Sequence, residues 1–163
     1  MHDLGEAERG RAIELVLVGM TTCHSCVAAG EDFEGPSPDE VALLRAAKQA
    51  GFRFISCENR LVSVQQGGRG RRWEVLRVLE FDSDRKRMAV VLRGDEGLAV
   101  FAKGADSAIS LTLAPEQQHL SAITARTHQM ACAGLRSLWF AHKSLPPGTD
   151  PASLSEAEIE SGL

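Results

Sequence analysis

Apolar residues recur along this chain with two different periods, one helical and one strand-like. Helical spacing over Glu6–Ala28 predicts a first helix. A second helix is predicted over Pro38–Ala50, because Ser37 can cap its first turn and Gly51 can end it. Its apolar residues fall on one face, which predicts that this helix packs on a sheet; they are Val41, Leu43, Leu44 and Ala47.

Short runs of strand-forming residues make up much of the chain after Gly51. We predict strands at Phe52–Cys57, Leu61–Gln66, Arg72–Glu80, Arg87–Arg93, Leu98–Ala102 and Leu135–His142. Two further helices are expected between the last two strands, over Asp106–Leu113 and Pro115–Ala133. Consecutive strands on short turns pair antiparallel, so the pattern predicts an α+β fold with a mainly antiparallel sheet flanked by helices.

The composition is that of one globular domain. The chain has 163 residues, of which 44% are hydrophobic and 25% are charged. We expect a folded domain over residues 1–145 and a polar, linker-like tail over 146–163. The net charge of −4 disfavours a nucleic-acid partner, and neither a membrane-spanning run nor a signal peptide is evident, so we expect a cytosolic location.

Four cysteines are present, and two of them lie in the string Cys23-His24-Ser25-Cys26. A structural zinc site needs four ligands, usually from two such close pairs. Cys57 and Cys132 stand alone in apolar surroundings. We therefore expect reduced thiols and no metal site, with a zinc-binding interaction module as an alternative.

Two motifs at strand ends carry the candidate chemistry. Phe81 interrupts the alternation of its strand just before a polar cluster, where its ring could stack on a purine or fold back under the sheet. Lys103 and Gly104 end a later strand, and a glycine there would let a flat ligand approach the backbone. An ordinary strand-to-helix turn explains Lys103 and Gly104 equally well.

Four motifs in this order resemble the nucleotide-binding domain of P-type ATPases, and within that family the phospholipid-translocating ATPases, or flippases. They are Ser37-Pro38-Asp39-Glu40, the run Glu80–Met88, Lys103-Gly104-Ala105-Asp106, and Gly134-Leu135-Arg136-Ser137-Leu138. The resemblance implies that Phe81 stacks on the adenine of ATP and that Lys103 and Gly104 line the pocket. It also implies that Glu40 accepts a hydrogen bond from the adenine amino group and that Arg136 reaches phosphate or ribose. Lys86 would face the nucleotide, and Ser83 would make a lesser polar contact.

The same resemblance implies a larger parent protein at the cytosolic face of a membrane. No Asp-Lys-Thr-Gly-Thr phosphorylation motif occurs here, so the chain alone should bind ATP without turning it over. Mg²⁺ would be held mainly through ATP and a separate phosphorylation domain. Expected partners are that domain, an actuator domain and a non-catalytic membrane glycoprotein subunit. A cation-pumping parent and a free-standing nucleotide sensor remain alternatives.

Overall fold

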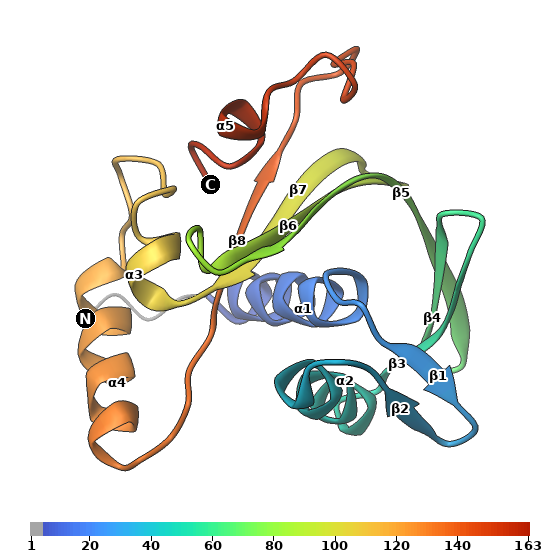
Figure 1. The fold of residues 1–163 in the computed structure, drawn as a ribbon, viewed down its shortest axis with the longest axis horizontal. Coiled ribbons are helices and arrows are strands. Elements are labelled where there is room, and N and C mark those ends of the chain that lie inside the picture. The colour runs from blue at the N-terminus through green and yellow to red at the C-terminus, as the bar shows by residue number, and fades with distance from the viewer. Residues whose placement is uncertain (1–4) are drawn as a thin grey trace. The chain divides into compact units, whose positions relative to one another are not determined.

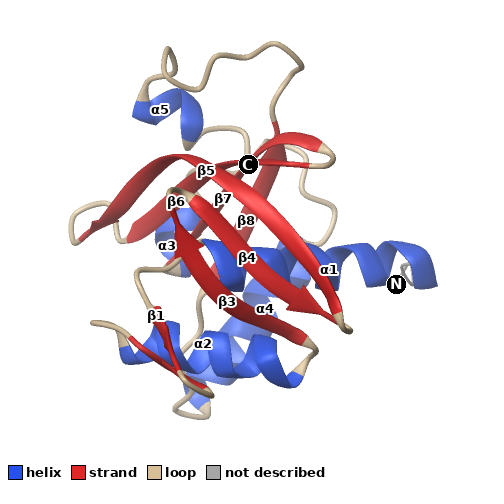
Figure 2. Ribbon diagram, turned by 90° about the vertical axis from the view of Figure 1, so that its right-hand side faces the viewer, coloured by secondary structure: helices blue, strands red, loops and turns tan. Residues whose placement is uncertain are grey.

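A computed structural model describes residues 5–163 of the chain. The chain divides into two compact units at Val75 and Leu76, within one long strand. Figure 1 gives the element labels, and Figure 2 shows helices and strands in separate colours. None of the helices in this described range is long and apolar enough to cross a membrane.

The N-terminal unit combines helices with the first strands of the main sheet. Its elements are α1 (Glu6–Thr22), β1 (Val27–Ala29), β2 (Asp32–Glu34), α2 (Pro38–Gln49), β3 (Phe52–Glu58), β4 (Leu61–Gln66) and the first part of β5 (Arg69–Asp82). The α2 helix begins as predicted, since the hydroxyl of Ser37 accepts the backbone N–H of Glu40 at 3.4 Å. Leu44 and Ala47 of α2 are fully buried, as expected of the face that packs on β3.

The first helix is shorter than the pattern predicted. It ends at Thr22, and the chain then forms the small antiparallel hairpin of β1 and β2. The hydroxyl of Thr21 donates to the carbonyl oxygen of Leu17 at 2.9 Å, one turn back in the helix. The hydroxyl of Thr22 donates in the same way to the carbonyl oxygen of Val18 at 2.7 Å. Hydroxyls at such positions compete with the regular helix, a local effect that apolar spacing does not reveal.

The C-terminal unit contains the rest of β5 and the last three strands of the main sheet. Its other elements are β6 (Arg87–Gly94), β7 (Gly97–Gly104), α3 (Asp106–Ile109), α4 (Leu120–Cys132), β8 (Trp139–Ser144) and α5 (Glu156–Ile159). Residues 115–119, predicted to be helical, precede α4 without joining it. The core of this unit is apolar and drawn from strands and helices alike, with Val91, Val100, Ala102, Ile109 and Ile159 each at 0% exposure.

Within residues 5–163 the main sheet has six strands, which follow one another in chain order from β3 to β8. The pairs β3–β4, β4–β5, β6–β7 and β7–β8 are antiparallel. Together with the flanking helices this confirms the predicted α+β class. The sheet needs no crossover connection, because each strand lies beside its predecessor in the chain.

Residues 146–163, which we expected to be a linker-like tail, form part of the C-terminal unit and contribute to its core. Ile159 is fully buried and Leu163 is 5% exposed. The backbone of Leu163 pairs with Thr112 and Ala114 at 3.0 and 2.9 Å. Arg77 donates to the carbonyls of Pro151 and Leu154. The polar composition of this segment suggested a linker. Its backbone nevertheless accepts hydrogen bonds from a side chain outside the segment, that of Arg77. The domain boundary after residue 145 stays a prediction.

Candidate nucleotide-binding site

Antiparallel order brings four chain segments to one end of the sheet in the C-terminal unit. There β5 ends, β6 begins, β7 ends and β8 begins. The register places Gly104 opposite both Arg87 and Trp139. Five of the seven predicted site residues lie at this end, and they are Phe81, Ser83, Lys86, Lys103 and Gly104; Arg136 lies on the loop that precedes β8.

Phe81 is the penultimate residue of β5, and its side chain is 64% exposed. A phenylalanine folded back under the sheet would be buried, so that alternative is excluded. Leaving a ring in water forgoes the stabilisation of about 1.5–3 kcal/mol that full burial would bring. An exposed ring at a strand end presents a face on which a base can stack.

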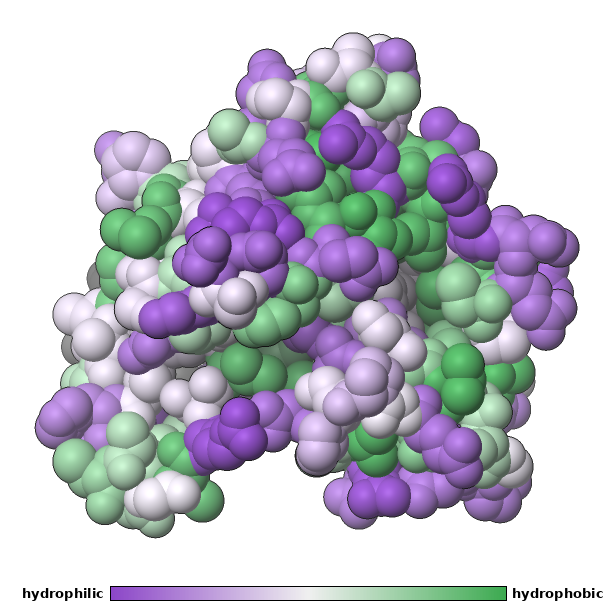
Figure 3. Space-filling view, in the orientation of Figure 1, coloured by the Kyte–Doolittle hydropathy of each residue, from purple (hydrophilic) through white to green (hydrophobic). Residues whose placement is uncertain are grey.

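The turn after Phe81 is ordered by Asp82. One carboxylate oxygen accepts the backbone N–H groups of Asp84 and Arg85 at 2.8 and 2.9 Å. These hydrogen bonds lower the pKa of Asp82 below its usual value, and the one from the N–H of Arg85 has the larger effect. The carbonyl of Asp82 also accepts the N–H of Lys86 at 2.7 Å, which closes the turn. Figure 3 shows hydrophilic side chains gathered around this turn.

Ser83 and Lys86 are both exposed in this turn. In a regular strand, alternation would send Lys86 to the opposite face from Arg85 and Arg87. The residue is instead set apart by the turn itself, since Lys86 adopts a left-handed φ of 52° and β6 begins only at Arg87. Arg85 and Arg87 do share a side, because both contact Glu160.

Gly104 lies against the same turn from β7. A Cβ at Gly104 would come within 2.5 Å of the Lys86 carbonyl oxygen and 2.7 Å of the Arg87 Cβ. That carbonyl also accepts the N–H of Ala105 at 3.1 Å. The glycine is therefore required for the close approach of β7 to the turn at Lys86. Its contact with a nucleotide stays a prediction.

Lys103 precedes this glycine and is only 6% exposed. It lies in register with Met88 on one side and Phe140 on the other. A lysine at such depth is uncommon unless its ammonium group is paired. Lys103 thus places a positive charge within the end of the sheet, whereas Lys86 places one on its surface.

Arg136 follows α4 and precedes β8. The α4 helix ends through Gly134, whose φ is +75°, and the N–H of Leu135 bonds to the carbonyl of Met130 at 3.0 Å. Arg136 is exposed, and Trp139, three residues later, pairs with Gly104. The predicted strand begins later than expected, so Arg136 lies on a loop that leads to the site rather than within a strand.

Glu40 belongs to the N-terminal unit and is 8% exposed. Its carboxylate accepts the backbone N–H of Ser25 at 2.9 Å and lies 3.7 Å from the sulfur of Cys26. The structure thus gives Glu40 a local role, in which it orders the segment before β1. Its contact with adenine stays a prediction.

The Cys23–Cys26 string is folded as a packed turn. His24 uses both ring nitrogens, since Nε2 lies 3.0 Å from the Thr21 carbonyl and Nδ1 accepts the N–H of Cys26 at 3.1 Å. Its ring also packs edge-on against Phe54, 4.5 Å between centroids. Cys23 and Cys26 are buried free thiols. Within residues 5–163 no three metal-binding side chains cluster.

One residue beside the site was missed by the sequence analysis. Glu160 is 4% exposed and pairs with both Arg85 and Arg87. Arg85 and Arg87 are spaced two residues apart, which is compatible with a shared partner but does not identify one. Nothing in the sequence pattern placed that partner more than seventy residues later in a segment expected to be a linker.

The chain matches proteins of known family over most of its length. It is 30% identical over 152 residues to a phospholipid-transporting ATPase of Schizosaccharomyces pombe, which covers 89% of this chain and 12% of that protein. Phospholipid-transporting ATPase IC of Xenopus tropicalis is 33% identical over 134 residues, or 79% of this chain and 11% of the relative. A phospholipid-transporting ATPase of Chaetomium thermophilum is 34% identical over 148 residues, with 85% and 10% covered.

The chain therefore spans about a tenth of the length of these relatives. Residues 13–163 match the family described as the P-type ATPase cytoplasmic domain N. The order of the four motifs and the α+β fold agree with that match. The chain belongs to the family of P-type ATPase cytoplasmic N domains.

Proposed function

We propose that this domain binds ATP at the sheet end formed by β5, β6, β7 and β8. The observation that carries the proposal is the exposed ring of Phe81, 64% accessible beside a turn that holds a surface lysine. Adenine stacks on Phe81, and such stacking contributes about 1–3 kcal/mol per base.

Three cationic side chains supply the complement to the triphosphate. Lys86 is exposed in the turn, Lys103 is buried in β7, and Arg136 lies on the loop before β8. Arginine binds phosphate oxygens bidentately, and lysine acts as a point charge. Ser83 adds a polar contact, and Mg²⁺ arrives with the phosphates of ATP.

The parent protein is, in this proposal, a phospholipid-translocating P-type ATPase at the cytosolic face of a membrane. The names of the relatives support this assignment over a cation-pumping parent. The domain positions the γ-phosphate, and an aspartate of a separate phosphorylation domain accepts it. The further partners that we propose are an actuator domain of the parent protein and a non-catalytic membrane glycoprotein subunit.

The test is a titration of the chain with Mg-ATP, followed by backbone amide NMR. Saturable shifts should concentrate in residues 81–86, 103–105 and 134–138. Phosphate release should stay at the level of a buffer control. Shifts confined to other strands, or sustained hydrolysis by protein freed of contaminating ATPases, would contradict the proposal.

A further inference from the structure

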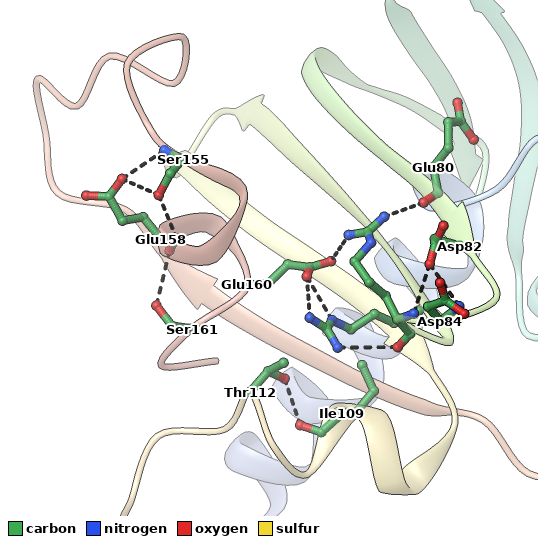
Figure 4. A network of polar contacts seen from close by, with 11 residues as sticks. Glu80, Asp82, Asp84, Ile109, Thr112, Ser155, Glu158, Glu160 and Ser161 are labelled. Atoms are coloured by element: carbon green, nitrogen blue, oxygen red, sulfur yellow. Dashed lines mark hydrogen bonds and ion pairs between the residues drawn. The ribbon is translucent and has the colours of Figure 1, made fainter.

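A buried carboxylate joins the C-terminal segment to the turn that carries the proposed site. Glu160 Oε1 lies 2.7 Å from Arg85 Nη1, and Oε2 lies 2.6 Å from Arg87 Nη2 and 2.8 Å from Arg87 Nε. Figure 4 shows the carboxylate between the two guanidinium groups. Glu160 is 4% exposed, and the arginine side chains are 25% and 18% exposed, so water screens these pairs little.

The backbone around Glu160 is fixed from several sides. Its neighbour Ile159 is fully buried in the core of the unit. Lys143 of β8 donates to the carbonyls of Glu158 and Ser161, both at 2.6 Å. Ser155 and Glu158 form a reciprocal cap at the start of α5, which is also visible in Figure 4. Glu160 is thus presented to the arginines from an anchored segment.

The two arginines in turn hold both sides of the turn. Arg85 donates to the carbonyl of Glu80 at 2.6 Å, immediately before Phe81. Arg87 donates to the carbonyl of Arg85 at 3.3 Å, immediately before Lys86. The network therefore closes around the segment that contains the proposed stacking ring and the surface lysine.

We propose that Glu160 is a positioning residue of the nucleotide site, acting through Arg85 and Arg87 to hold Phe81 and Lys86 in a binding-competent arrangement. This inference rests on the proposed function. A site that is already ordered loses less conformational entropy when ligand binds. When only a fraction of molecules is competent, the apparent dissociation constant rises by the inverse of that fraction.

The central variant is Glu160→Gln, which keeps the side-chain volume and removes the charge. Its matched control is Glu156→Gln, an exposed glutamate of the same C-terminal segment. If about a tenth of Glu160→Gln molecules keep a competent turn, ATP affinity falls about tenfold. Glu156→Gln should bind ATP as the unchanged chain does. Both are titrated at a temperature where circular dichroism shows the fold intact.

A second readout separates positioning from general destabilisation. Amide hydrogen exchange is measured at Lys86 and Ala105, whose N–H groups bond to Asp82 and Lys86, and at Ile109 and Thr112 in the core. Glu160→Gln should speed exchange at Lys86 and Ala105 alone. Equal acceleration at all four amides would mean that Glu160 serves the fold and would overturn the inference.

Arg85→Gln provides a route should Glu160→Gln fail to fold. It removes the bonds to Glu160 and to the Glu80 carbonyl while Arg87 keeps its pair. A loss of ATP affinity with an intact fold supports the inference. Unchanged affinity in a folded Glu160→Gln or Arg85→Gln overturns it.

Phe81→Ala is the reference that separates the two proposals. If Phe81→Ala loses ATP affinity while folded Glu160→Gln keeps it, the inference fails and the proposed function stands. If the unchanged chain binds no ATP, or Phe81→Ala binds as the unchanged chain does, the proposed function fails and the inference falls with it.

Discussion

The Cα of Gly104 lies so close to the turn at Lys86 that a Cβ there would approach the lysine carbonyl oxygen to 2.5 Å. This backbone atom cannot move aside like a side-chain end, because the same carbonyl accepts the N–H of Ala105. Gly104→Ala should therefore destabilise the domain by about 1–3 kcal/mol, the usual range for overpacking. Chemical denaturation of the variant measures this loss.

Gly70→Ala is the matched control for that substitution. Gly70 also lies in a strand, and its Cβ would meet nothing within 4 Å. Its unfolding midpoint should change little. If Gly104→Ala and Gly70→Ala unfold at the same midpoint, β7 does not approach the turn at Lys86 closely enough to exclude a Cβ at position 104.

A second prediction concerns the C-terminal segment. Ile159 is fully buried, so Ile159→Ala should cost about 2–5 kcal/mol of unfolding free energy. Leu111→Ala is the control, because Leu111 is 85% exposed. Thermal melts of the two variants compare them directly. Equal and small effects would favour a loose tail over a packed segment.

Helices and strands were predicted accurately where capping residues or a regular apolar alternation mark their ends in the sequence. The α2 helix and the β4 strand were placed within a residue, because Ser37 and Gly51 bound the helix and the strand alternates cleanly. The start of α4 was misplaced at Pro115, since a proline that suits a first helical turn suits an extended loop as well. The buried role of Ile159 depends on a core formed by distant strands, which local pattern does not reveal.

The candidate site shows the same division. Phe81 was noted because it breaks the alternation of β5 beside polar residues, and the family resemblance favoured a stacking ring over one folded under the sheet; its exposure agrees with a stacking ring. Gly104 was noted because a glycine lets a flat ligand approach the backbone, and the structure adds a separate reason for a glycine there, the neighbouring turn at Lys86. Glu160 was not foreseen, because an ion pair across such a sequence separation leaves no periodic signal.

A third prediction concerns the pKa of Asp82, which the N–H groups of Arg85 and Asp84 lower. A carboxyl whose pKa is lower in the folded state than in the unfolded state stabilises the fold at pH values above its unfolded-state pKa of about 3.9. This stabilisation is lost as the pH falls from that value through the folded-state pKa. The turn should thus stay intact at pH 5 and loosen only below about pH 3.9.

The carboxyl carbon chemical shift of Asp82 reports this titration by NMR. Asp82→Asn removes the ionisable group, so its unfolding free energy should depend less on pH in the acid range. A midpoint for Asp82 at or above that of an unfolded aspartate, or an unaltered acid profile in Asp82→Asn, would contradict the hydrogen-bond arrangement of the turn.

The central claim is that the exposed ring of Phe81 is a platform for adenine. Phe81→Ala should weaken ATP binding by about 1–3 kcal/mol, a factor of roughly 5 to 150 in affinity. Its stability should fall by much less than the ~3–5 kcal/mol of a buried phenylalanine, because the ring is 64% exposed. Phe101→Ala, at a ring only 5% exposed, provides the contrast in stability.

The most direct measurement is a Mg-ATP titration of Phe81→Ala beside the unchanged chain, with a melt of each protein in the same buffer. We predict a large loss of ATP affinity and a small change in melting temperature. Unchanged ATP affinity together with a large fall in melting temperature would show that Phe81 serves the fold, and would contradict the assignment of this sheet end as the nucleotide site.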